Sequence, residues 1–338
     1  NSKFDEIVQE RAKEFALKSS RPSDAKGVEL TPLNRRFAED GSISYSVVDV
    51  AMDRANKRVT IAISGPDTDS PASMDAFHSQ GADAYMLRMA RELDDAILHL
   101  RLNEMELGLI VFKTQGDPER MQAHEDLLLN NKDHWLANEV LQYWKRILKR
   151  IDMTSRSLVA LVEHGSCFTG VLAELLFSVD RSYMMEDEFE GDNRKLCAIT
   201  LSASNFGQYP MSNDLTRLQT RFLGDPATVE ELKGIVGDAL EAPDAAKLGL
   251  ITYALDDIDW EDEIRIFMEE RASFSPDAMT AMEANLRFAG PETMETRIFG
   301  RLNAWQNWVF QRPNAVGEDG ALQSYGTGRR GKYNMERV

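Results

Sequence analysis

The sequence predicts an α/β fold that ends in a helical extension. Short apolar runs alternate with amphipathic helical patterns from residue 44 to residue 253, and only helical patterns follow residue 256. The clearest unit runs from Leu158 to Met184: an apolar strand, a turn of small residues and an almost wholly apolar helix over 171–179. Because free N–H groups at a helix start favour negative charge, this unit is either a tight core connection or a place where negative charge develops.

Composition excludes several classes of function. The net charge of −17 and the pI near 4.8 argue against nucleic acid as a partner. A hydrophobic content of 43% is enough for a sizeable core. Cys167 and Cys197 do not make a disulfide framework. No apolar run reaches the roughly 18 residues of a membrane span and no signal peptide is visible, so we expect a cytoplasmic protein without a membrane partner.

The remaining elements are assigned from periodicity, caps and turn residues. In the first half we expect a helix over 1–18, a connector over 19–42, a hairpin of Ser44–Asp53 and Val59–Ser64, a loop over 65–81, helices over 83–102 and 132–150, and strands over 107–112 and 157–162. In the second half we expect an acidic surface loop over 186–192, strands over 196–201 and 250–253, and helices over 215–222, 228–240, 243–248, 259–272, 276–288 and 291–310. Thr228 with Glu231 has the spacing of a capping box, Ser275 should cap the helix after it, and the tail from Pro313 shows no periodicity.

The order of these motifs resembles the crotonase superfamily, the enoyl-CoA hydratase/isomerase group. The matching residues are Gly165, Gly170, Glu174, Leu175 and Asp180, then Ser202, Ala203, Gly207, Pro210, Arg217 and Leu218, and the segment over 245–251. The likeness spans roughly residues 44–288. It implies a crotonase-like (ClpP/crotonase) fold of repeated β-β-α units, here with an N-terminal linker helix and a C-terminal helical extension.

A narrower resemblance concerns the tail. Residues 285–317, together with Asn205-Phe-Gly and Lys132-Asp-His-Trp, are similar to one ring-opening branch of the superfamily, whose members are much longer than a usual crotonase. The resemblance implies a lyase that opens 2,3-dihydro-2,3-dihydroxybenzoyl-CoA with water and releases formate in aerobic benzoate degradation. It implies a CoA thioester as substrate and no metal or redox cofactor. The present chain would be the C-terminal portion of such an enzyme.

A weak internal repeat supports the assignment of this chain to the C-terminal portion of a longer enzyme. Residues 4–24 loosely repeat residues 260–278: each has an acidic start, an amphipathic helix containing Arg-Ala, and then Pro with Asp-Ala. The alternative is a chance likeness between two acidic helices. With duplication, residues 1–40 are the closing helix and linker of a preceding crotonase domain, residues 41–255 a degenerate crotonase-like domain, and residues 256–338 a C-terminal helical extension and tail.

The candidate site departs from the family pattern. In crotonases two backbone N–H groups hold the thioester oxygen, and carboxylates move protons nearby. Here the first donor segment shrinks to Gln115-Gly116-Asp117-Pro118, and the glycines of the second donor loop shrink to Thr169-Gly170-Val171. Glu174 matches one family glutamate but lies one residue later, about 100° further around the helix. The second glutamate falls on Ala203, which carries no proton. Glu174 is therefore the only catalytic candidate, and Thr169 and Gly170 are candidates for oxyanion or CoA binding.

Three functional hypotheses follow. The leading one is a scaffold and dimerisation half, which supports an active site in the N-terminal crotonase domain of the same protein and forms a homodimer through helices over 291–310. The second is a self-sufficient acyl-CoA hydratase or isomerase that uses Glu174. The third is a module that binds acyl-CoA without converting it. Arg329, Arg330 and Lys332 could contact a CoA phosphate, although a frayed basic tail is the default interpretation. Cys167 is interpreted as a packed thiol rather than a nucleophile, and the five histidines lack the spacing of a metal site.

Overall fold

An eight-stranded sheet forms the centre of the computed structural model, which describes residues 3–20, 24, 26–186, 194 and 197–337. The strand order is β1-β2-β3-β4-β5-β6-β7-β10, antiparallel from β1 to β4 and parallel from β4 onward. The strands are β1 (Arg36–Phe37), β2 (Ile43–Ser44), β3 (Val48–Asp53), β4 (Arg58–Ser64), β5 (Leu109–Gln115), β6 (Ser157–Val162), β7 (Arg181–Met185) and β10 (Tyr253–Leu255). All residues of β6 are buried, as expected for a parallel strand covered on both faces.

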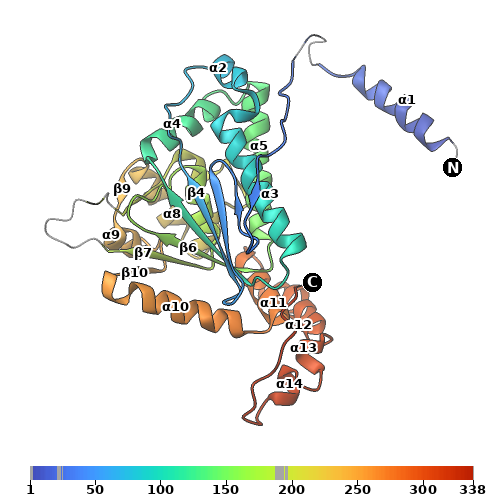
Figure 1. The fold of residues 1–338 in the computed structure, drawn as a ribbon, viewed down its shortest axis with the longest axis vertical. Helices are drawn as coiled ribbons and strands as arrows, with labels where there is room; N and C mark the ends of the chain where they lie inside the picture. The colour runs from blue at the N-terminus through green and yellow to red at the C-terminus, as the bar shows by residue number, and fades with distance from the viewer. Residues whose placement is uncertain (1–2, 21–23, 25, 187–193, 195–196, 338) are drawn as a thin grey trace.

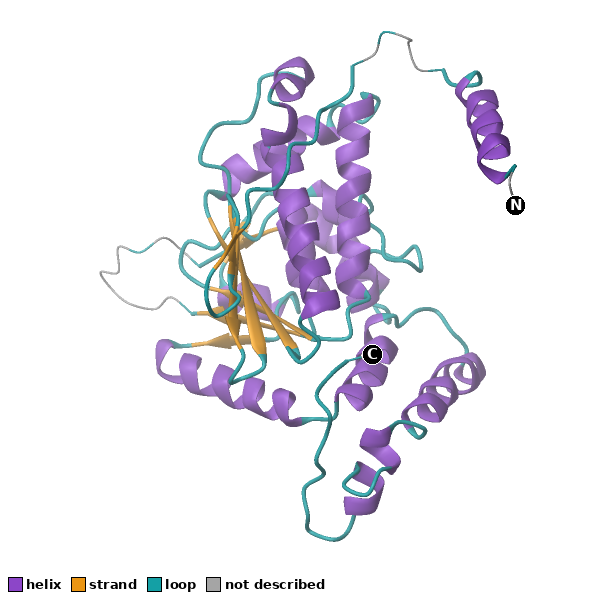
Figure 2. Cartoon of the chain, turned by 45° about the vertical axis from the view of Figure 1, so that its right-hand side comes forward, coloured by secondary structure: helices purple, strands orange, loops and turns teal. Residues whose placement is uncertain are grey.

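Long helices cover one face of this sheet (Figure 2). The long helices are α3 (Tyr85–Asn103), α4 (Pro118–Leu129) and α5 (Trp135–Asp152). The same layer also contains the shorter helices α2 (Met74–Ser79) and α6 (Val171–Ser178) and the 3₁₀ turn η1 (Gly81–Asp83). Trp144 of α5 is fully buried and donates its indole N–H to the Met86 carbonyl oxygen at 3.0 Å. The apolar side chains of these helices and the adjacent sheet face form the largest core cluster.

The other face of the sheet is covered by α10 (Asp257–Ser273). This helix runs along the lower edge of the α/β body in Figure 1. Trp260, Ile264 and Phe267 of α10 pack with Val111 of β5 and Val159 of β6. The helix therefore completes the core of the sheet, although it lies after the boundary at residue 256 that the sequence predicts between domain and extension.

A second small layer lies on the far side of α6. It contains β8 (Ile199–Thr200) paired with β9 (Ala239–Leu240), the 3₁₀ turns η2 (Ala203–Phe206) and η3 (Lys233–Ile235), and helices α7 (Arg217–Arg221), α8 (Pro226–Leu232) and α9 (Ala242–Lys247). Its apolar residues form a core cluster with Ala173, Leu176 and Phe177 of α6. Because α6 is enclosed by both clusters, every one of its residues is buried.

The two ends of the chain differ in how they pack. At the N-terminal end, α1 (Phe4–Ala16) has no buried residue and stands apart from the rest in Figure 1. At the other end come α11 (Pro276–Arg287), the π-helix η4 (Thr296–Leu302), α12 (Asn303–Val309), α13 (Pro313–Val316) and α14 (Ala321–Ser324). The chain then returns to the α/β body, where the Arg337 side chain donates to the Ser155 carbonyl oxygen at 3.2 Å.

Several local expectations are wrong, each for a physical reason. The N-cap of α8 is Asp225, whose carboxylate accepts the Thr228 N–H at 3.3 Å, and Pro226 lies in the first turn. Instead of at residue 240, the helix ends at Leu232, where the chain continues as the 3₁₀ turn η3 that contains Gly234. The helix expected over 291–310 is divided into a π-helix and α12, and the tail beyond Pro313 contains two short helices. The loop expected over 65–81 contains α2. Residues 187–192 of the predicted acidic loop lie outside the described residues.

The strand–turn–helix unit at Leu158 to Met184 is confirmed as β6, α6 and β7. Ser275 also caps α11, accepting the Ala278 N–H at 3.5 Å. Among the described residues, no helix is long and apolar enough to cross a membrane.

Candidate functional site

The start of α6 is the place where the sequence predicts an oxyanion site. Gly170 is its N-cap, with φ 56° and ψ −132°, a combination that only glycine adopts without strain. A side chain at this position would overlap the carboxylate of Glu125, which lies directly against the Gly170 backbone. The turn glycine therefore admits a carboxylate that comes from another helix.

Glu125 belongs to α4 and is fully buried. Its carboxylate accepts a hydrogen bond from the Tyr209 hydroxyl at 2.9 Å and another from the Ser204 hydroxyl at 3.1 Å. Burial raises the pKa of Glu125 to about 7, more than the two hydrogen bonds lower it, and the nearby charge of Glu174 raises it further. A carboxyl group with this pKa can accept and release a proton near neutral pH.

Sequence reasoning missed Glu125, although one signal was present. Met121, Glu125 and Leu128 share the buried face of α4, so the glutamate occupies a position at which an apolar residue is expected. The position matched to the second family glutamate is Ala203, and its neighbour Ser204 donates to Glu125. A carboxylate is thus present beside that segment, but it comes from α4.

Glu174, the candidate from the sequence, has a different environment. Its carboxylate accepts from the Asn205 amide at 2.8 Å and from the Arg217 guanidinium at 2.8 Å. Arg217 also binds both oxygens of Asp152, at 3.1 and 2.6 Å. All three charged side chains are about 2% exposed or less. Glu174 is therefore one carboxylate of a buried ion network that ties α5, α6 and α7 together.

The predicted first donor is already engaged. The Gly116 N–H donates to the Gly165 carbonyl oxygen at 3.0 Å, and the Gly65 N–H donates to the Gln115 carbonyl oxygen at 2.7 Å. Gly65 and Gly116 pack so closely that a Cβ on Gly116 would lie 2.9 Å from the Gly65 Cα. The ends of β4 and β5 and the turn after β6 are thus joined backbone to backbone.

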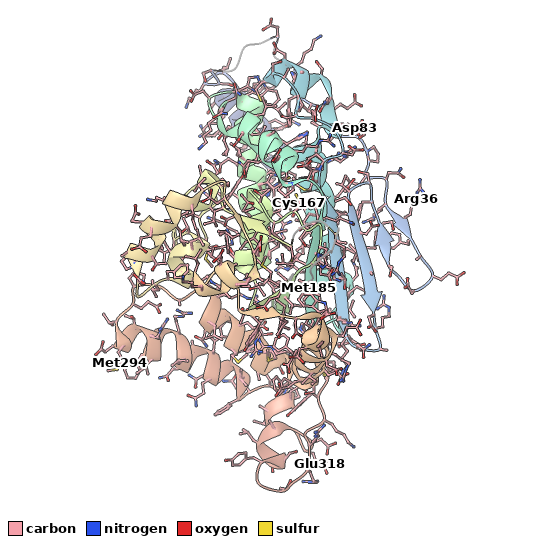
Figure 3. The ribbon with its side chains drawn as sticks, turned by 90° about the vertical axis from the view of Figure 1, so that its left-hand side faces the viewer. Arg36, Asp83, Cys167, Met185, Met294 and Glu318 are labelled. Carbon is pink, nitrogen blue, oxygen red and sulfur yellow. The ribbon has the colours of Figure 1, made fainter. Side chains whose placement is uncertain are left out.

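The rest of the predicted donor loop is packed. Thr169 is 1% exposed, and its hydroxyl donates to the Gln122 side chain at 3.2 Å. The Gly170 carbonyl oxygen accepts from the Asn205 amide at 3.1 Å. Cys167 is fully buried, and Figure 3 labels it near the centre of the molecule. The structure therefore brings Thr169, Gly170 and Glu125 together in a filled interior.

Other charged groups lie elsewhere. Among the described residues, no group of three or more His, Cys, Asp or Glu side chains is placed to hold a metal ion. Arg329, Arg330 and Lys332 are exposed on the tail.

The fold matches solved structures over most of the chain. An enoyl-CoA hydratase from Geobacillus kaustophilus HTA426 superposes with a TM-score of 0.61, covering 87% of this chain and 98% of that one at 14% identity. An enoyl-CoA hydratase/isomerase from Marinobacter aquaeolei gives a TM-score of 0.57 over 85% of this chain and 98% of that one, also at 14% identity. The chain has a crotonase-like fold. At these identities the comparison concerns the fold alone.

The sequence comparison is closer. The chain is 46% identical to the benzoyl-CoA-dihydrodiol lyase of Aromatoleum evansii over 335 residues, which is 99% of this chain. It is therefore a sequence relative of a lyase, as the resemblance of the tail indicates. The chain spans 59% of that relative's length. That the match lies in the C-terminal portion of the relative stays a prediction. No protein-family model matches the chain.

Proposed function

We propose that this chain is the scaffold portion of a lyase of the benzoyl-CoA-dihydrodiol type, and that the ring-opening chemistry is carried by residues outside it. The observation that carries this proposal is the filled start of α6. The Gly116 N–H is bonded to the Gly165 carbonyl, and Glu125 lies against Gly170 where a thioester oxygen would have to enter.

An oxyanion site presents hydrogen-bond donors about 3 Å from the position of the developing charge. Here a substrate would have to displace a backbone hydrogen bond and a buried carboxylate that becomes negatively charged above its pKa of about 7. A negative carboxylate repels a developing oxyanion next to it. The start of α6, which would favour an oxyanion in a crotonase, therefore opposes one here because Glu125 lies against it.

Under this proposal the parts of the chain have separate roles. Residues 1–40 link to a preceding N-terminal crotonase domain, residues 41–255 are the degenerate domain, and residues 256–338 form the helical extension. The substrate of the whole enzyme is the CoA thioester of the dihydrodiol, without metal or redox cofactor, in the cytoplasm. Met294, Phe299 and Leu302 expose large apolar surfaces within the range 291–310, which supports a homodimer through that segment.

The test is turnover by this chain. Residues 1–338 are incubated with 2,3-dihydro-2,3-dihydroxybenzoyl-CoA, and loss of thioester and release of formate are followed, with the Aromatoleum evansii lyase run in parallel as the active control. We expect no formate from this chain under conditions in which the control consumes its substrate. Formate release by the chain alone refutes the proposal.

A second candidate function is proton transfer within this chain, and the pKa of Glu125 favours it. If turnover is seen, Glu125→Gln and Glu174→Gln identify its source: the first variant should lose activity if Glu125 moves the proton, and the second if the sequence-based hydratase hypothesis holds. Calorimetry with benzoyl-CoA on the unaltered chain tests the third hypothesis, because a binding module would give saturable heat without product.

A further inference from the structure

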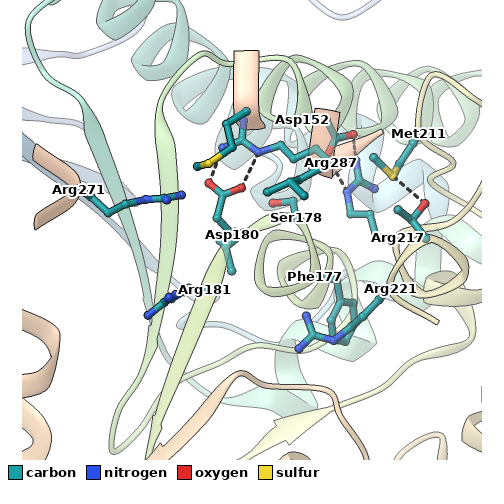
Figure 4. A pocket seen from close by; sticks show the side chains of 14 residues that line it. Asp152, Phe177, Ser178, Asp180, Arg181, Met211, Arg217, Arg221, Arg271 and Arg287 are labelled. Carbon is teal, nitrogen blue, oxygen red and sulfur yellow. Dashed lines mark hydrogen bonds and ion pairs between the residues drawn. The ribbon is translucent and has the colours of Figure 1, made fainter. Parts of the chain in front are cut away.

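A cavity of about 400 Å³ lies at the C-terminal end of α6, opposite the site described above. The eight residues of α6 separate the two places by about 12 Å. Side chains from α5, α7, α10, α11 and the α6–β7 connection line it, as Figure 4 shows. Its volume falls in the range of pockets that hold small organic molecules.

Arginine dominates the charge of this cavity. Two of its arginines are neutralised: Arg217 by Asp152 at 2.6 Å, and Arg287 by Asp180 at 2.5 Å. Asp152 and Asp180 are also the only acidic residues among the described residues that line the cavity.

Three further arginines, Arg181, Arg221 and Arg271, surround the open part of the cavity in Figure 4. The Arg221 Nε donates to the Gly249 carbonyl oxygen at 2.5 Å, and Arg181 lies 4.4 Å from the ring centroid of Phe267. The ion pairs between described residues give neither of these two a carboxylate partner.

Arg271 is only partly neutralised. One of its terminal nitrogens is 3.6 Å from a Glu283 oxygen, and its Nε is buried without a hydrogen-bond acceptor among the described residues. Burial, and then the nearby charge of Asp180, raise the pKa of Glu283 to about 7. A buried guanidinium donor without an acceptor costs free energy that an anion would recover.

Arg221 is held in a buried environment. Burial lowers the pKa of its guanidinium, and no acidic side chain among the described residues offsets that effect. Positive charge is thus held in a cleft of a protein whose net charge is −17. The cavity is also lined by apolar side chains, those of Phe177, Val179, Met211, Met282 and Leu286.

We propose that this cavity binds a small organic oxyanion, a carboxylate or a phosphate ester. Its charged group is held by the arginines that lack a carboxylate partner or are only partly neutralised, Arg181, Arg221 and Arg271, and its compact apolar body packs on apolar lining residues such as Phe177 and Met282. Guanidinium groups suit both oxyanions because their N–H donors match two oxygens at once. The site does not depend on the scaffold role proposed above, since it uses the other end of α6 and involves no turnover.

The test is direct binding to residues 1–338, measured by calorimetry. Three probes of similar shape are compared: benzoate, phenyl phosphate and the neutral benzamide. We expect saturable binding of at least one anion and none of benzamide, and the tighter anion assigns the carboxylate or the phosphate class. Absence of saturable anion binding, or equal binding of benzamide, overturns the proposal.

A variant places the binding in this cavity. Arg221→Gln should weaken the better anion about tenfold or more, because a charge-assisted hydrogen bond and its charge are removed. Arg265→Gln is the matched control: this arginine is 53% exposed on α10 and outside the cavity. Thermal unfolding checks that each variant is folded, and Arg181→Gln replaces Arg221→Gln if the latter does not fold. Unchanged affinity in the folded variant refutes the assignment.

Discussion

Replacing Glu125 with glutamine should change how the stability of the protein depends on pH. The pKa of Glu125 is raised from an ordinary value of 4.5 to about 7, with burial as the largest cause. A carboxyl group whose pKa is higher in the folded state binds its proton more tightly there. Its contribution to stability is therefore fully present below the ordinary pKa and is lost as the pH rises through about 7.

The magnitude follows from the shift. Each pKa unit corresponds to about 1.4 kcal/mol, so the protonated carboxyl group contributes about 3 kcal/mol at low pH, of which about 2.5 kcal/mol is lost between pH 5 and pH 8. Glutamine resembles the neutral acid in shape and does not titrate. We expect the wild type and Glu125→Gln to be similarly stable near pH 5, and the wild type to be the less stable protein by about 2–3 kcal/mol at pH 8.

The assay is urea unfolding of both proteins at several pH values from 5 to 8, followed by tryptophan fluorescence, to which the buried Trp144 and Trp260 contribute. Glu283 also has a pKa raised to about 7, but it is present in both proteins and cancels in the difference. Glu119→Gln, an exposed change on the same helix, is the control. A difference between wild type and Glu125→Gln that stays constant from pH 5 to pH 8 would mean that Glu125 is not the buried titrating group inferred here.

Further predictions concern the packing around the same region and the tail. Gly170→Ala should lower the free energy of unfolding by about 1–3 kcal/mol, because the φ of residue 170 is positive and the new Cβ would overlap Glu125. In a Glu125→Ala background the same substitution should lower the free energy of unfolding by less. Equal effects in both backgrounds, measured by urea unfolding, would contradict the predicted overlap. Arg217→Met should cost about 3–5 kcal/mol by leaving two buried carboxylates unpaired. Arg265→Met, on the exposed face of α10, should change the same measurement by less than about 0.5 kcal/mol, and equal losses in both would refute the network. Asn314→Ala should speed limited proteolysis of the tail after residue 313 and leave the unfolding midpoint of the α/β body nearly unchanged. The reason is that the Asn314 side chain hydrogen-bonds both to Asp277 of α11 and to the backbone of Asn334 near the end of the chain.

The central unit of the fold could be predicted because its signal is local. An apolar strand, two glycines with positive φ and an apolar helix occupy adjacent positions, so pattern alone specifies β6, the turn and α6. The start of α8 is predicted incorrectly because two local patterns compete. Asp225 with Pro226 and Thr228 with Glu231 both satisfy the rules for a helix start, and the structure uses the aspartate and the proline.

The candidate site could be predicted only in part, because what decides it is long-range. The turn predicts Gly170, but the pKa of Glu125 depends first on burial and then on hydrogen bonds such as that from Tyr209, which lies 84 residues further along the chain. Likewise, Glu174 reads as a family glutamate until Arg217, 43 residues away, is seen to bind it. Desolvation and ion pairing are properties of the packed molecule, so a sequence pattern can place such residues on a helix but cannot give their partners.

The complete enclosure of α6 between two core clusters has a consequence for solvent exchange. Away from the cavity at the C-terminal end of α6, its hydrogen-bonded backbone amides are shielded from water by both clusters, so their deuterium uptake should occur only through global unfolding. Those few amides would then serve as an internal gauge: their exchange rate measures the stability of the whole α/β body, whereas the exposed helix α1 should exchange within the dead time of the same experiment.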